Sequence, residues 1–233
     1  MRFTRKIALL AITTITISGI QAAQARPKAK ANELVSYSVI HAIPLSYGAD
    51  VVDVYANNVL VIDNATPGSI KNLTISRGNA TISFYANGIV PGPTTTPLLS
   101  STPTYLSNGG NFSFVAHLSA DEKPKLSQFK NMVTEAGSKR SWLTIRHVAA
   151  ATALQFRTNG NPVFVPLANS IERKRSLAFG SYTIDALYSD TSTVAINPYS
   201  LSLQKGTNVV LYVWGAKSKG NLAVLKQDIG ARD

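Results

Sequence analysis

Residues 36–62 read SYSVIHAIPLSYGADVVDVYANNVLVI, and a fainter copy of this stretch, SWLTIRHVAAATALQFRTNGNPVFV, follows at residues 141–165. In each copy a segment with alternating residues ends in a histidine, His41 in the first and His147 in the second. A second run of β-forming residues comes after a short loop. Because alternation with a period of two is typical of half-buried strands, each copy predicts a pair of β-strands.

A tight turn closes the second strand of each copy, at Asn57-Asn58 and at Asn159-Gly160. Asparagine and glycine tolerate the positive φ angles that such turns need. Two later turn signals recur in the same order and at nearly constant spacing: Gly78 with Gly180, and Gly109 with Gly206. The sequence therefore indicates an internal repeat that extends well beyond the first two strands.

The strands are short, turn signals are frequent, and no segment has a long amphipathic helical stripe, which favours β-sandwiches. We predict an all-β fold of two tandem Ig-like or transthyretin-like β-sandwich domains, at residues 35–136 and 137–233. The 233 residues are 45% hydrophobic, which is enough apolar material for two such domains. Because the sequence has no cysteine, burial and backbone pairing must stabilise them without disulfides.

The N-terminus has the pattern of a secretory signal peptide at residues 1–25. A basic segment (Met1–Lys6) precedes an apolar run (Ile7–Ile20) and a small-residue cleavage site (Ala23–Ala25). The apolar run is shorter than the roughly twenty residues of a membrane span. The alternative is a retained N-terminal anchor. Residues 26–34 then predict a short disordered leader.

Cleavage after Ala25 lowers the formal net charge from +11 to +8, so the mature protein stays basic. We expect no transmembrane segment in the mature chain. The predicted location is extracellular, either secreted or held non-covalently at the cell envelope. An exported chain without interleaved surface aromatics is not expected to bind nucleic acid.

One segment resembles a known family. Val39-Ile40-His41-Ala42, then Pro44, then Val52-Asp53-Val54-Tyr55 are similar to the signature V-H-A-S-P-D-A-P-x-V-D-V-Y of domain-of-unknown-function family 4397. The resemblance implies tandem β-sandwiches on or outside a bacterial cell, without established chemistry. The chain departs from the signature at Ile43, and the Asp of V-D-V-Y becomes Gln155 in the second copy.

His41, Asp50 and Asp53 lie close together in the sequence and could serve as metal ligands or as an acid–base pair. The alternative is that they make local hydrogen bonds. Gln155 supports this alternative, because it stands in the second copy where the first has the carboxylate of Asp53. The sequence has no G-x-S-x-G motif and no glycine-rich phosphate loop. We therefore predict no catalytic, cofactor or metal site and keep a secreted hydrolase with an unrecognised active site as the alternative.

Arg173, Lys174 and Arg175 form the densest basic run inside a predicted domain. They are candidates for contact with an anionic partner, such as an envelope polymer or another surface protein. The alternative is an edge strand that uses charge to avoid aggregation. Trp142 and Trp214 could stack on sugars, but their apolar strands favour packing in the core. We predict a non-catalytic binding, adhesion or envelope-structural protein.

Overall fold

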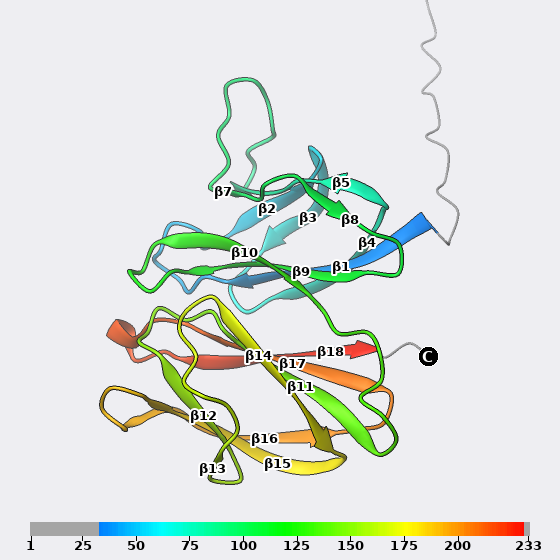
Figure 1. Cartoon of the computed structure of the whole chain (residues 1–233). Helices are drawn as coiled ribbons and strands as arrows, with labels where there is room; N and C mark the ends of the chain where they lie inside the picture. Colours follow the sequence, from blue (N-terminus) through cyan, green and yellow to red (C-terminus); the bar gives the residue numbers. More distant parts are fainter. Residues whose placement is uncertain (1–32, 231–233) are drawn as a thin grey trace, which may run out of the picture.

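The computed structural model describes residues 33–230 (Figure 1). The predicted signal peptide, residues 26–32 of the predicted leader and residues 231–233 therefore lie outside the described part of the chain. The described part is built from eighteen strands with a short 3-10 turn, η2 (Lys217–Lys219), so the all-β prediction is confirmed.

The first half of the structure contains ten strands in two main sheets. One sheet has the order β10-β9-β1-β4 and the other β3-β2-β6-β7, while β5 and β8 form a small separate pair. The strands are β1 (Leu34–Ala42), β2 (Val52–Ala56), β3 (Val59–Ala65), β4 (Ile70–Ser76), β5 (Gly78–Ala80), β6 (Ile82–Ala86), β7 (Leu99–Ser100), β8 (Thr104–Leu106), β9 (Asn111–Leu118) and β10 (Pro124–Lys130).

The second half contains eight strands in two sheets, with the orders β14-β11-β17-β18 and β13-β12-β15-β16. Its strands are β11 (Arg140–His147), β12 (Leu154–Thr158), β13 (Asn161–Pro162), β14 (Ile171–Ala178), β15 (Gly180–Tyr188), β16 (Val194–Leu203), β17 (Thr207–Trp214) and β18 (Ala223–Gly230). The predicted division into domains at residue 137 falls between β10 and β11. That these halves are independent domains stays a prediction.

The internal repeat is visible in the strand pairing. β1 pairs in parallel with β9 and antiparallel with β4, and β11 pairs in parallel with β17 and antiparallel with β14. β10 adds to β9 as β18 adds to β17. The sheets β10-β9-β1-β4 and β18-β17-β11-β14 are therefore equivalent strand for strand.

Each half has its own apolar core, and a third core lies between the halves. Buried side chains of β1, β9 and β10 pack there with those of β17 and β18 in one cluster: Ile40, Ala42, Val115, Phe129, Val148, Val210, Tyr212 and Ile229. The two equivalent sheets thus face each other, as Figure 1 shows where the group β1–β10 lies against the group β11–β18. We call this packing the seam.

The two tryptophans are half-buried. Trp214 packs against the apolar cluster of the seam and lies over Gly68, where a Cβ atom would come within 3.6 Å of the indole ring. The backbone nitrogen of Trp142 lies 3.4 Å from the Asn208 Oδ1 atom that accepts its hydrogen bond. Trp214 therefore packs at the seam and does not form an exposed platform, and Trp142 is half-buried.

Candidate functional site at the edge of the seam

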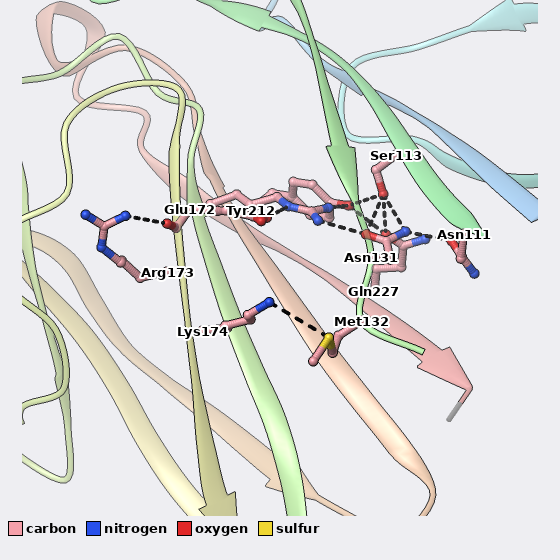
Figure 2. Close-up of polar contacts among 10 residues, drawn as sticks. Asn111, Ser113, Asn131, Met132, Glu172, Arg173, Lys174, Tyr212 and Gln227 are labelled. Carbon is pink, nitrogen blue, oxygen red and sulfur yellow. Dashed lines mark hydrogen bonds and ion pairs between the residues drawn. The ribbon is translucent and has the colours of Figure 1, made fainter. Parts of the chain in front are cut away.

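Arg173, Lys174 and Arg175 lie in the middle of β14, which is the edge strand of its sheet, and all three are exposed. Because side chains alternate along a strand, Lys174 points to the opposite side from the two arginines. Figure 2 shows Arg173 and Lys174 on opposite sides of β14. An Arg175 Nη1 atom donates to the carbonyl oxygen of Val163 at 3.0 Å, which holds that side chain against the second half.

The seam adds two lysines of the first half to this run. β10 lies beside β14 because Lys125 Nζ donates to Ser170 Oγ at 3.0 Å and Lys174 Nζ lies 3.8 Å from the Met132 sulfur. Lys125 and Lys130 are both exposed on β10. We call the group Lys125, Lys130, Arg173, Lys174 and Arg175 the basic flank. These residues lie along the edge of the seam where β10 meets β14, with side chains on both sides of the two strands.

Sequence reasoning missed the two lysines of the basic flank because they precede the run on β14 by more than forty positions. The available signal was the high charge of residues 119–140, which we interpreted as an edge element and linker. None of the ion pairs in residues 33–230 includes a residue of the basic flank. The cations of these ion pairs are Lys123, Arg146, Arg157, Lys217 and Lys226.

The carboxylate beside the basic run is held by a buried arginine. Glu172 on β14 accepts a hydrogen bond from Arg146 Nε at 2.9 Å. The Arg146 side chain is 0% exposed and Glu172 is 34% exposed. Arg146 also donates to Tyr212 Oη and to Asn131 Oδ1, each at 2.8 Å, and its guanidinium lies 4.4 Å from the centre of the Phe129 ring. A buried charge is tolerable when it is paired and hydrogen-bonded in this way.

Hydrogen bonds continue from Arg146 across the whole seam. Tyr212 Oη donates to Gln227 Oε1 at 2.6 Å, and Gln227 Nε2 donates to Ser38 Oγ at 2.6 Å. Ser38 Oγ in turn donates to Asn72 Oδ1 at 2.8 Å. Burial raises the pKa of Tyr212, which keeps its hydroxyl protonated as a donor. This network therefore connects β14, which carries three residues of the basic flank (Figure 2), to β4 on the opposite side of the seam.

His41 and His147 perform the same structural task in the two halves. His41 Nε2 lies 2.6 Å from the carbonyl oxygen of Ala49, and His147 Nε2 lies 3.0 Å from that of Thr152. A carbonyl oxygen only accepts, so each Nε2 carries the proton, while Nδ1 accepts from the backbone two residues later. Burial lowers the pKa of both rings. Each histidine therefore fastens the loop that follows its strand.

The two aspartates also hold backbone groups. Asp50 Oδ1 accepts from the nitrogen of Ser46 at 2.7 Å. Asp53 accepts from Asn64 at 2.9 Å through Oδ1 and from Gly88 at 2.8 Å through Oδ2. At the equivalent position Gln155 donates to the carbonyl oxygen of Phe164. The local hydrogen bonds considered for this group are thus present.

One pair has the composition of a nucleophile and its base. Ser127 Oγ lies 2.8 Å from His117 Nε2, and His117 Nδ1 lies 2.8 Å from the carbonyl oxygen of Leu118. His117 is completely buried in the seam, and burial lowers its pKa to about 4. A base of such low pKa takes a serine proton poorly near neutral pH. The contact instead joins β9 to β10.

Two further features are absent from residues 33–230. No group of three or more His, Cys, Asp or Glu side chains there is placed to hold a metal ion. No helix in this part of the chain is long and apolar enough to cross a membrane.

Residues 36–157 match the family model described as Domain of unknown function (DUF4397). The chain belongs to this family. The resemblance seen in the sequence is thereby confirmed, and the matched DUF4397 region runs from β1 to β12. No curated protein matches the chain.

Two solved structures show weak similarity to this DUF4397 protein. "The Bacillus anthracis TIE protein" has a TM-score of 0.24 and 11% identity, over 78% of this chain and 33% of that chain. The present chain thus spans about a third of that protein. The structure titled "Alpha-glucan binding by a streptococcal virulence factor" has a TM-score of 0.25 and 7% identity, over 82% and 95% of the two chains. TM-scores this low carry no conclusion about function.

Proposed function

We propose that this protein is an exported, non-catalytic binding module that attaches to an anionic polymer of the cell envelope through the basic flank. The observation that carries the proposal is the contrast between two equivalent edge strands. β4 and β14 have the same place in the two seam sheets. The registers place Lys71, Asn72 and Leu73 of β4 at the positions of Arg173, Lys174 and Arg175.

An edge strand needs protection from pairing with another chain, and charge is one way to provide it. Both strands have this need, yet β4 has one cation where β14 has three. The strands β10 and β18 show the same difference in charge. Lys130 on β10 has the position that Asp228 has on β18. Positive charge thus gathers on one flank beyond what protection of an edge requires, which supports attraction of an anionic partner.

The test is binding to a sulfated dextran and to isolated envelope, with uncharged dextran as the reference. We expect the protein to bind the sulfated polymer and to lose this binding between low and moderate salt, because the Debye length falls to about 8 Å at physiological ionic strength. The variant Arg173→Glu, Lys174→Glu, Arg175→Glu should abolish binding. Its melting temperature should stay close to that of the unchanged protein, since exposed substitutions cost within about 0.5 kcal/mol each.

A matched control separates the basic flank from the overall charge. Lys71→Glu, Lys205→Glu and Lys219→Glu change the net charge by the same amount at exposed sites away from the basic flank. We expect this control to retain most of the binding. Equal loss in the two triple variants, or binding that ignores salt, contradicts the proposal.

A further inference from the structure

Two grooves open on either side of β18, on the flank of the seam opposite to the basic residues. The first groove, of about 510 Å³, lies between β18 and the strands β1 and β4 of the first half. The second, of about 410 Å³, lies between β18 and β16 within the second half. Asp228 lines both grooves, so they adjoin at this residue, and we call the two grooves together the cleft along β18.

The first groove has a wall of short polar side chains at fixed positions. The strand registers place Thr74, Ser36 and Asn111 next to one another on β4, β1 and β9. Behind this row, Gln227 Nε2 binds Asn72 Oδ1 at 3.2 Å as part of the seam network. Because that network holds the strands together, the polar row is organised before any ligand arrives.

The second groove is also lined mainly by hydroxyl and amide groups. The half-buried Tyr199 lies among them. Lys226 and Asp228 form an ion pair at 2.7 Å within it, so the formal charges of the groove cancel. Its hydroxyl and amide groups come from Ser200, Ser202, Gln204 and Thr207.

This chemistry selects among classes of ligand. Hydroxyls and amides both donate and accept hydrogen bonds, which matches a ligand covered with hydroxyl groups. A purely apolar ligand would leave these polar groups without partners, at a cost in free energy. The Asp228 carboxylate repels an anionic chain. On the basic flank the equivalent position carries Lys130, which attracts one. The volumes lie within the roughly 300–1,000 Å³ of small-ligand sites, which occur preferentially between domains.

We propose that the cleft along β18 binds a neutral, polyhydroxylated chain, that is, an uncharged oligosaccharide. Asp228, between the two grooves, accepts hydrogen bonds from the sugar hydroxyls. Tyr199 offers the aromatic ring of the second groove, since tyrosine presents an apolar face and a polar tip. This site lies on other strands than the basic flank and is independent of the function proposed above.

The full chain is titrated calorimetrically with uncharged glucose, cellulose and chitin hexasaccharides in about 0.5 M NaCl, where interactions through the basic flank are screened. We expect at least one hexasaccharide to bind and its affinity to be nearly independent of salt. Asp228→Asn should weaken this affinity about tenfold, because an amide cannot replace both acceptor oxygens.

Two variants block the grooves without touching the apolar cores. Thr74→Trp fills the first groove and Ser202→Trp the second, and both residues are exposed. Each should weaken oligosaccharide binding while sulfated dextran still binds, and the triple glutamate variant of β14 should do the reverse. The proposal is overturned if no uncharged hexasaccharide binds at millimolar concentration, or if binding survives both tryptophan variants.

Discussion

Asn57 in the first half and Asn159 in the second half make the same two hydrogen bonds. The Oδ1 atom of each accepts from a threonine nitrogen, Thr81 at 2.9 Å and Thr183 at 2.8 Å. The backbone nitrogen of each asparagine donates to the carbonyl oxygen of that same threonine. Side chains that fix the path of the backbone therefore recur in the two halves. The hydrogen bonds of His41 and His147 to the loops that follow them recur in the same way.

The surfaces through which the halves meet differ strongly. The strand registers make Arg146 equivalent to Ile40, and Tyr212 equivalent to Val115. The first half thus brings apolar side chains to positions where the second half brings hydrogen-bonding groups. The apolar seam face of the first half and the polar seam face of the second half are therefore not interchangeable. We conclude that the seam side chains fix how the halves dock, whereas the repeated side chains fix how each half folds.

The largest effect should come from removing the arginine of the seam. Arg146→Ala leaves Tyr212 Oη and Asn131 Oδ1 without their buried donor, and two buried groups left unsatisfied at about 1–3 kcal/mol each cost about 2–6 kcal/mol. We expect a loss of that size in the free energy of unfolding, measured with urea. Ile40→Met, at the equivalent position, is the control and should cost less than about 1.5 kcal/mol because it keeps volume and polarity. A loss below about 1 kcal/mol in Arg146→Ala would contradict a structural role for the network.

The sequence predicted the fold better than the seam, for a physical reason. Alternation and asparagine turns are local, so they indicated β-structure and the repeat. Trp142, Thr144 and Arg146 alternate with Leu143 and Ile145, as they would on a strand with one solvated face. Both faces of β11 are instead largely buried, because a second sheet covers the polar one. Neither this covering nor the meeting of β10 with β14 leaves a periodic signal in the sequence.

The basic run was visible in the sequence, but its extent was not. Arg173, Lys174 and Arg175 are consecutive, so their charge stands out without any structure. Lys125 and Lys130 join them only through packing between strands that are distant in the sequence. A contact of this kind depends on the docking of complete sheets, which composition and spacing do not specify.

An intermediate effect should appear on acidification, because the first half places His117 in the seam where the second half has Trp214. The folded pKa of His117, about 4, lies below the unfolded value of about 6.5, so the unfolded chain binds more protons between these values. The stabilisation is complete above pH 6.5 and is lost as the pH falls toward 4. We expect a loss of about 2 kcal/mol from His117 between pH 7.5 and 5.

The measurement is urea unfolding at several pH values for the unchanged protein and for His117→Gln. The variant lacks the titrating ring, so its stability should depend less steeply on pH over this window. His41 and His147, whose pKa values burial also lowers, remain in both proteins and supply the residual slope. Identical slopes in the two proteins would show that His117 titrates normally in the folded state.

The smallest effect concerns the two asparagine turns, which differ at one residue. Asn58 has a φ of 63°, and Gly160 has a φ of 78° at the same place in the second half. Left-handed backbone costs an L-residue with a side chain up to about 1 kcal/mol more than glycine, and less for asparagine. Asn58→Gly should therefore raise the free energy of unfolding by a few tenths of a kcal/mol, and Gly160→Asn should lower it by a similar amount.

Asn57→Gly is the informative contrast. It relieves the same left-handed backbone conformation but removes the acceptor for the Thr81 nitrogen, so it should destabilise the protein. If Asn57→Gly and Asn58→Gly stabilise equally, the side-chain hydrogen bond that recurs in the two halves contributes nothing, and backbone conformation alone explains the repeated turn.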